Sequence, residues 1–157
     1  MTPLPIAPTV AEAADPEREW AAGLMASSEP WLTLGRGLAD CRVACHRPGY
    51  LMLVAREGDT PLAFALLHPR GVAGSPYLAS FAVAASARGR GIGAFLLSAC
   101  ERRFRPAARH FFLCVSSFNT RARAFYERQG YAKVGELPDY LIDGASEILM
   151  HKRLDRP

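Results

Sequence analysis

The sequence contains only two lysines, Lys133 and Lys152, so arginine supplies nearly all of its 19 basic side chains. Against 15 acidic residues these give a net charge of only +4. No basic run is interleaved with aromatic residues in the way that tracks a phosphate backbone. The composition therefore predicts no nucleic-acid partner, although the arginines would suit a smaller anionic ligand.

Long apolar runs are also missing. No stretch reaches the roughly 20 residues that a membrane-spanning helix needs, and the N-terminus lacks the basic start and apolar centre of a signal peptide. We therefore expect a cytoplasmic protein with no membrane partner. Its Pro/Ala-rich residues 1–15 are expected to form a flexible leader, followed by a single domain over residues 16–157.

Cysteine is sparse, with four residues at positions 41, 45, 100 and 114. Cys41 and Cys45 are followed by His46, but a second pair of ligands at metal-site spacing is lacking. The expectation is that no metal is bound and that the cysteines are reduced and mostly buried.

Apolar periodicity and turn residues define the expected elements. They predict helices over 16–28, 36–46, 93–105 and 120–130, the first capped by Asp15, and strands over 50–57, 61–69, 77–85, 110–117, 131–137 and 147–154. This order favours an α/β protein with a mixed, mostly antiparallel central sheet and helices on both faces. The strand–helix–strand unit from Tyr77 to Ser116 should place its two strands parallel.

A glycine-rich stretch, "RGRGIGA", runs from Arg88 to Ala94 between a predicted strand and a predicted helix. It cannot be a nucleotide P-loop, because no lysine is near, and its glycines are not spaced as in a dinucleotide fingerprint. A plain turn would explain one or two of the glycines. Three glycines with two arginines at a helix N-terminus indicate a site for an anion such as pyrophosphate.

This stretch matches the Arg/Gln-x-x-Gly-x-Gly/Ala signature of the GNAT superfamily of acetyl-CoA-dependent N-acyltransferases. The segment "FAVAASARGRGIGAFLL" resembles the central strand, pyrophosphate loop and following helix of that superfamily. Further along, "SSFNTRARAFYERQGYAKVGEL" resembles its next conserved segment. The element order from about Tyr50 to Leu154 agrees, so the resemblance implies a GNAT-type fold and acetyl-CoA as co-substrate.

The resemblance also implies which residues contact the cofactor. In this family the strand before the loop pairs its backbone with the pantetheine arm, and the matching residues are Phe81, Ala82 and Val83. The pyrophosphate cradle matches Arg88, Gly89, Arg90, Gly91, Gly93 and Ala94. Asn119 matches a residue that contacts the pantetheine arm, although it is equally suited to cap a helix.

Tyr126 matches the family's general acid, which protonates the departing CoA thiolate. A phenol suits this role because its ordinary pKa, about 10, lies not far above that of a thiol. On position alone, Tyr126 could instead be an aromatic packed beside Phe125. The implied reaction is direct attack of an amine on the thioester in a ternary complex, with the carbonyl polarised by a backbone N–H, that of Val83.

The general base is where the sequence departs from its relatives. Many of these carry a glutamate on the strand before the glycine loop or on the next one, but neither strand here contains a carboxylate. Cys114 aligns with the glutamate of the ribosomal-protein acetyltransferases and is a poor base. Either a water chain removes the proton or the base comes from elsewhere, with candidates His68, Glu136, Asp139, Tyr140 and Glu147.

The acceptor is expected to be a small-molecule or peptide amine, held between the N-terminal helices and the loop "LPDYLIDGAS". A homodimer is compatible with the resemblance. The missing base leaves open a different class of function, a non-catalytic acyl-CoA-binding sensor or scaffold, against which the "FYERQGY" segment argues.

Overall fold

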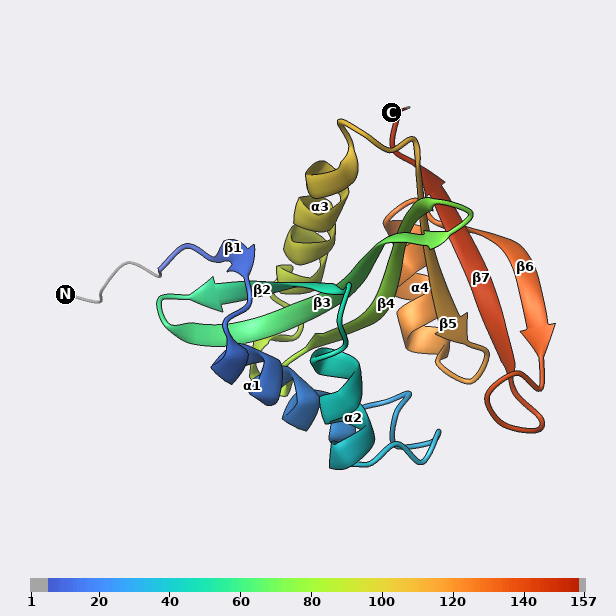
Figure 1. Ribbon diagram of the computed structural model, residues 1–157, viewed down its shortest axis with the longest axis horizontal. Coiled ribbons are helices and arrows are strands. Elements are labelled where there is room, and N and C mark those ends of the chain that lie inside the picture. The colour runs from blue at the N-terminus through green and yellow to red at the C-terminus, as the bar shows by residue number, and fades with distance from the viewer. Residues whose placement is uncertain (1–5, 156–157) are drawn as a thin grey trace.

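The computed structural model describes residues 6–155. They form one β-sheet with helices packed on both of its faces (Figure 1). The elements follow in the order β1 (Thr9–Glu12), α1 (Asp15–Ala26), α2 (Leu38–Cys45), β2 (Leu51–Glu57), β3 (Thr60–Val72), β4 (Ser75–Val83), a 3-10 turn (Ala85–Ala87), α3 (Ile92–Phe104), β5 (His110–Ser116), α4 (Thr120–Arg128), β6 (Ala132–Pro138) and β7 (Ser146–Arg153). No helix among these residues is long and apolar enough to cross a membrane.

The seven strands form one sheet in the order β1-β2-β3-β4-β5-β7-β6. Neighbouring strands are antiparallel except β4 and β5, which are parallel and are connected through α3. The expected mixed, mostly antiparallel α/β fold is therefore confirmed. Figure 1 shows β4 and β5 diverging from a common end, which divides the sheet into a β1–β4 half and a β5–β7 half.

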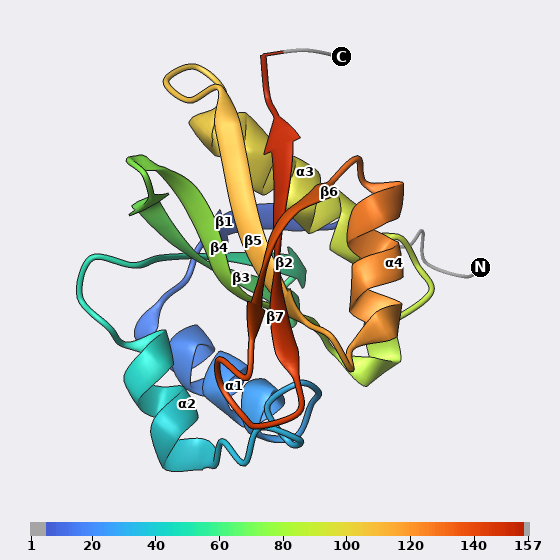
Figure 2. The ribbon, with the colours of Figure 1, turned by 90° about the vertical axis from the view of Figure 1, so that its right-hand side faces the viewer.

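Two apolar clusters hold the helices to the sheet. On one face, Ala22 and Met25 of α1 and Cys45 of α2 pack against side chains of β2 and β3 such as Phe64. On the other face, α3 and α4 cover both halves of the sheet, with Leu97 of α3 fully buried (Figure 2). This face contains the larger cluster and places the N-terminus of α3 next to the diverging strands.

The expectation of a flexible leader over residues 1–15 is wrong for its second half. Thr9–Glu12 form β1, which pairs antiparallel with β2, and Val10 packs against the larger cluster. Asp15 belongs to α1, whose N-cap is Ala14, and the Ala14 N–H donates to the Glu17 carboxylate at 3.0 Å. Residues 1–5 lie outside the described part of the chain.

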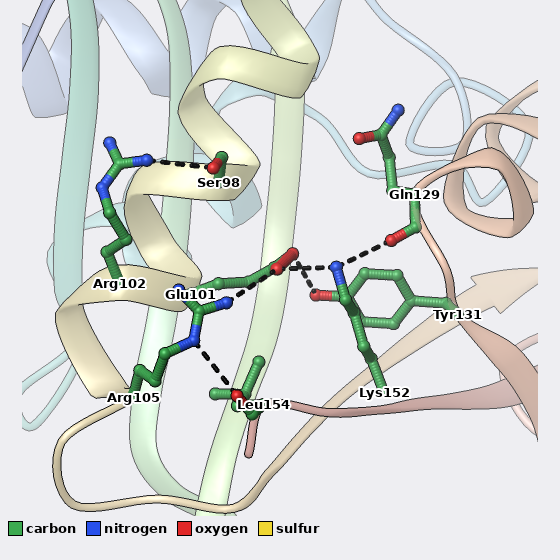
Figure 3. A network of polar contacts seen from close by, with 8 residues as sticks. All are labelled: Ser98, Glu101, Arg102, Arg105, Gln129, Tyr131, Lys152 and Leu154. Atoms are coloured by element: carbon green, nitrogen blue, oxygen red, sulfur yellow. Dashed lines mark hydrogen bonds and ion pairs between the residues drawn. The ribbon is translucent and has the colours of Figure 1, made fainter. Parts of the chain in front are cut away.

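A buried ionic network ties α3 to the C-terminal half of the sheet (Figure 3). Glu101 of α3 accepts hydrogen bonds from Lys152 Nζ at 2.7 Å and from the Tyr131 hydroxyl at 3.2 Å. Lys152 also donates to the carbonyl oxygen of Gln129, just after α4, at 2.8 Å. The Glu101–Lys152 pair thus connects α3 to β7 and to the end of α4.

Candidate functional site

The glycine loop forms the N-terminus of α3 with two residues in the left-handed backbone region. Gly91, the N-cap, has a φ of 78°, and Gly89 has a φ of 74°. Side chains with a Cβ rarely adopt this conformation, which explains glycine at both positions. The loop therefore leaves the first backbone N–H groups of α3, and the positive end of its dipole, open to an anion.

A groove of about 890 Å³ runs from this loop along the end of β4 and the face of α4. Its volume lies within the range of about 300–1,000 Å³ that is usual for ligand sites. Ten of the residues singled out from the sequence line it: Phe81, Ala82, Val83, Arg88, Gly89, Gly91, Gly93, Ala94, Asn119 and Tyr126. Arg90 does not line the groove and instead forms an ion pair with Glu57 of β2.

The β4 edge of the groove presents backbone groups that pair with no strand. β4 and β5 pair only through Tyr77 with Phe112 and Leu78 with Leu113, and beyond these pairs they separate. The Ala84 N–H donates to a β3 carbonyl at 2.8 Å. Because successive residues of a strand direct their backbone groups to opposite sides, the N–H and C=O of Phe81 and Val83 point into the gap, where the Val83 carbonyl accepts from Arg88 Nε at 3.3 Å.

A second cavity, of about 210 Å³, lies on the other side of this gap. Its walls include Pro30, Trp31 and Leu34 from the segment between α1 and α2, and Tyr140 and Leu141 from the loop between β6 and β7. The remaining wall is built by β4, β5, α4 and the start of β7. The cavity and the groove share Phe81, Asn119, Ala122 and Tyr126, so the two spaces meet at these side chains.

Tyr126 stands at this junction. It is 7% exposed, and its ring lies against those of Phe81, Phe125 and Tyr131 at centroid separations of 5.4–6.3 Å. Burial raises the pKa of the Tyr126 phenol well above its usual value. Among the described residues its hydroxyl has no hydrogen-bond partner, so the proton is free to be donated to a group entering the groove.

Asn119 occupies the N-cap of α4, and its side-chain oxygen accepts from the Ala122 N–H at 3.4 Å. The side chain also lines both spaces. An N-cap uses only the amide oxygen, so its NH₂ group can donate to a ligand. The two interpretations of Asn119 drawn from the sequence are therefore compatible.

The five candidate bases lie in different environments. Glu136 is exposed and pairs with Lys133, and this contact holds the pKa of its carboxyl below its usual range. The Asp139 carboxylate accepts from the Gly144 N–H at 2.6 Å, within its own loop. His68 lies on β3, where its ring packs edge-on against that of Tyr50, and it lines neither space. Tyr140 and Glu147 line the smaller cavity.

Several lining residues were not singled out from the sequence. Arg121 and Arg128 lie two turns apart on α4, so they share a face of this helix, and both line the groove. Ser27, Ser28 and Glu29 line it from the end of α1. The spacing of the two arginines could have been recognised from the predicted helix, but the approach of the α1–α2 segment depends on tertiary packing.

Comparison with known proteins gives a consistent family. Residues 11–131 match the sequence model of the acetyltransferase (GNAT) family. An uncharacterised N-acetyltransferase of Methanocaldococcus jannaschii is 39% identical over 82 residues, which cover 51% of this chain and 53% of that protein. The chain is thus matched over only about half the length of this relative.

Many solved structures share the fold. A protein of Desulfovibrio desulfuricans described as a GNAT-family acetyltransferase superimposes with a TM-score of 0.79 and 21% identity, covering 94% of this chain and 99% of its own. An aminoglycoside 6'-N-acetyltransferase complexed with coenzyme A superimposes with a TM-score of 0.77 and 18% identity, covering 95% and 99%. With the family match over most of its length, the chain belongs to the GNAT family of acetyltransferases.

Proposed function

We propose that this protein transfers an acetyl group from acetyl-CoA to a primary amine by direct attack in a ternary complex, with Tyr126 as the general acid. One observation carries the proposal: the groove and the smaller cavity meet at Phe81, Asn119, Ala122 and Tyr126. Two ligands that enter from opposite sides would bring their ends together beside the Tyr126 hydroxyl. Such juxtaposition is the main source of rate in a two-substrate transfer.

The residues of the groove fit acetyl-CoA. The N–H groups of the glycine loop, together with Arg88, suit a pyrophosphate, which a helix N-terminus favours. The backbone of Phe81 and the N–H of Val83, which pair with no strand, suit the amides of a pantetheine arm, which would lie along β4 as an added strand. Arg121 and Arg128 add positive charge on the α4 side.

The bound co-substrate supplies an activated acyl carbonyl. Residues of this protein position that carbonyl and transfer the protons. We infer that the Val83 N–H donates to the thioester oxygen as negative charge develops there. The Tyr126 hydroxyl donates a proton to the sulfur as the carbon–sulfur bond breaks and the carbon–nitrogen bond forms, and it is reprotonated from the amine nitrogen. The net products are an N-acetyl amine and free coenzyme A.

A free-thiol assay tests this proposal. The purified chain is mixed with acetyl-CoA and single members of a panel of alkylamines, polyamines, aminoglycosides, amino acids and amidated peptides. We expect amine-dependent thiol release and a product heavier by one acetyl group in mass spectrometry. Tight coenzyme A binding without release above background for every amine would favour the non-catalytic acyl-CoA sensor instead.

A further inference from the structure

Of the three carboxylates among the candidate bases, Glu147 alone is nearly buried. It is the second residue of β7, is 9% exposed, and lines the smaller cavity. Ser116 lies directly across the β5–β7 ladder, and its hydroxyl donates to a Glu147 carboxylate oxygen at 2.5 Å. The position is therefore fixed by a strand pairing and one hydrogen bond.

The cavity offers this carboxylate no cation. Of the described residues that line it, Glu147 alone carries a formal charge, and no ion pair joins it to any described residue. Burial raises the pKa of the Glu147 carboxyl, and the hydrogen bond from Ser116 offsets this in part. A buried carboxylate with a single neutral donor is electrostatically incomplete and favours a cationic ligand.

The groups that face Glu147 come from each neighbouring element. Ser116 and Cys114 on β5 and Tyr77 on β4 interact with it, and Tyr126 on α4 and Tyr140 in the β6–β7 loop line the same cavity. Burial raises the pKa values of Tyr77, Cys114 and Tyr126, so all three are neutral near pH 7. Glu147 is thus the group on the cavity wall that holds a negative charge there, among polar and aromatic neighbours.

We propose that Glu147 binds the ammonium group of the acceptor and takes its proton, and that it selects alkylammonium groups that have no carboxylate on the adjacent carbon. This inference rests on the proposed acetyl transfer. An amino acid would bring its own carboxylate into a small cavity whose described wall carries one negative charge and no positive one, and repulsion would exclude it. An alkylamine or the N-terminus of a peptide avoids that repulsion.

The proton balance is simple. The ammonium loses one proton to the Glu147 carboxylate, which gives a neutral amine and a carboxylic acid. The amine then forms the new bond to the acyl carbon, and its second proton replaces the one that Tyr126 gives to the leaving sulfur. Glu147 returns its proton to water after the product leaves, so the reaction releases one proton for each amide formed from an ammonium.

The volume of the cavity limits the group that it admits. At about 210 Å³ it is smaller than a typical site for a drug-sized ligand. Trp31, Leu34 and Leu141 give it apolar walls. A short branched or unbranched carbon chain next to the ammonium is therefore the expected occupant, and any larger part of the acceptor would remain outside.

Matched probes test the selectivity. Isoamylamine, leucinamide and an amidated leucyl dipeptide carry the same side chain as leucine, which alone has a free carboxylate next to its amine. We expect kcat/KM for the first three probes to exceed that for leucine by at least about 30-fold, on the scale by which repulsive groups discriminate. The amine and the dipeptide separate a small-molecule source from a peptide one. Equal turnover of leucine would overturn the selectivity.

The variant E147Q tests the role of Glu147 as proton acceptor. The matched control is E136Q, which replaces an exposed glutamate on β6. For E147Q with isoamylamine we expect kcat/KM to fall about 100-fold near pH 7. The wild-type rate should be level between about pH 7 and 9, whereas the variant should rise about tenfold per pH unit because it depends on free amine. An unchanged rate and profile in E147Q would refute the role.

A binding measurement separates this inference from the proposed transfer. With coenzyme A present, isoamylamine should raise the melting temperature of the wild type and of E136Q but not that of E147Q, while coenzyme A alone stabilises all three. Equal stabilisation of E147Q by the amine would overturn the ammonium site. Absence of thiol release by the wild type with every amine would instead count against the proposed transfer, whatever the melting result.

Discussion

The rings of Phe81 on β4 and Phe125 on α4 stack, with centroids 5.9 Å apart and planes inclined by 21°. The pair bridges the gap beyond the last β4–β5 register pair, where no strand ladder joins the two halves of the sheet. The distance from the β4 edge to the adjacent Tyr126 is thus set by aromatic packing. The geometry of the junction depends on side chains more than on the backbone.

Replacing Tyr126 by Phe should lower kcat about 100-fold and leave the affinity for coenzyme A unchanged, because only the donated proton is lost. The raised pKa keeps the phenol protonated across neutral and mildly alkaline pH, so the wild type should not lose activity there through this group. Steady-state kinetics and calorimetric titration with coenzyme A check this. Tyr131→Phe, which removes a hydroxyl bonded to Glu101, is the control and should retain most of the activity.

The two arginines of the glycine loop should differ. Arg88 lines the groove, whereas Arg90 is paired with Glu57 away from it. We expect Arg88→Ala to weaken coenzyme A binding about tenfold, the loss of one charge-assisted contact. Arg90→Ala should weaken it less than about threefold. Equal losses in calorimetric titration would show that Arg90 leaves Glu57 to join the anion site.

Much of the groove could be predicted from local sequence. Glycines that precede an amphipathic helix specify an anion site through backbone conformation alone, and Gly89 and Gly91 have the required positive φ values. Asn119 and the apolar spacing of α4 likewise follow from capping and periodicity. These features depend on residues within a turn or two of one another, so a single segment contains the necessary information.

The acceptor side could not be predicted in the same way. Glu147 becomes distinctive only because β7 pairs with β5 and places it across from Ser116, beside a cavity that the α1–α2 segment closes. On the sequence it was one of five equivalent candidates. β1 was missed for a related reason, since four residues in a Pro/Ala-rich stretch become a strand only when β2 offers them an edge.

Glu101→Gln should destabilise the protein by about 1–3 kcal/mol, because the half-buried Lys152 ammonium loses its charged partner. Urea unfolding monitored by circular dichroism measures the change. Glu127→Gln on the exposed side of α4, where the partner is Arg123, should change the free energy of unfolding by less than about 0.5 kcal/mol. Similar losses for both variants would show that burial of the network contributes little.

Glu147→Gln should make the protein more stable at neutral pH. The folded-state pKa of Glu147 is raised, so its contribution to stability is fully present below the ordinary carboxyl pKa and is lost as the pH rises through the higher folded value. The neutral amide escapes that loss. Melting curves from pH 4 to pH 8 should show the two proteins converging at the acid end and E147Q melting at the higher temperature at the neutral end.

Removing the Ser116 hydroxyl tests the protonation of Glu147 without changing Glu147 itself. The hydrogen bond from Ser116 lowers the pKa of Glu147, so Ser116→Ala should raise it further. The acidic limb of the kcat/KM profile with isoamylamine should then move to higher pH. A limb that stays in place would assign it to another group.

An unpaired strand edge ordinarily invites a second polypeptide and, with it, aggregation. The free edge of β4 is protected from that hazard by its location, since it lies inside the sheet, with β5 on one side and α4 above, instead of at the outer border. A polypeptide strand carries side chains above and below its plane and needs both faces clear. A narrow chain that contains amides but no side chains needs less space. The fold therefore leaves this strand edge accessible to small linear ligands and inaccessible to strands of other protein molecules.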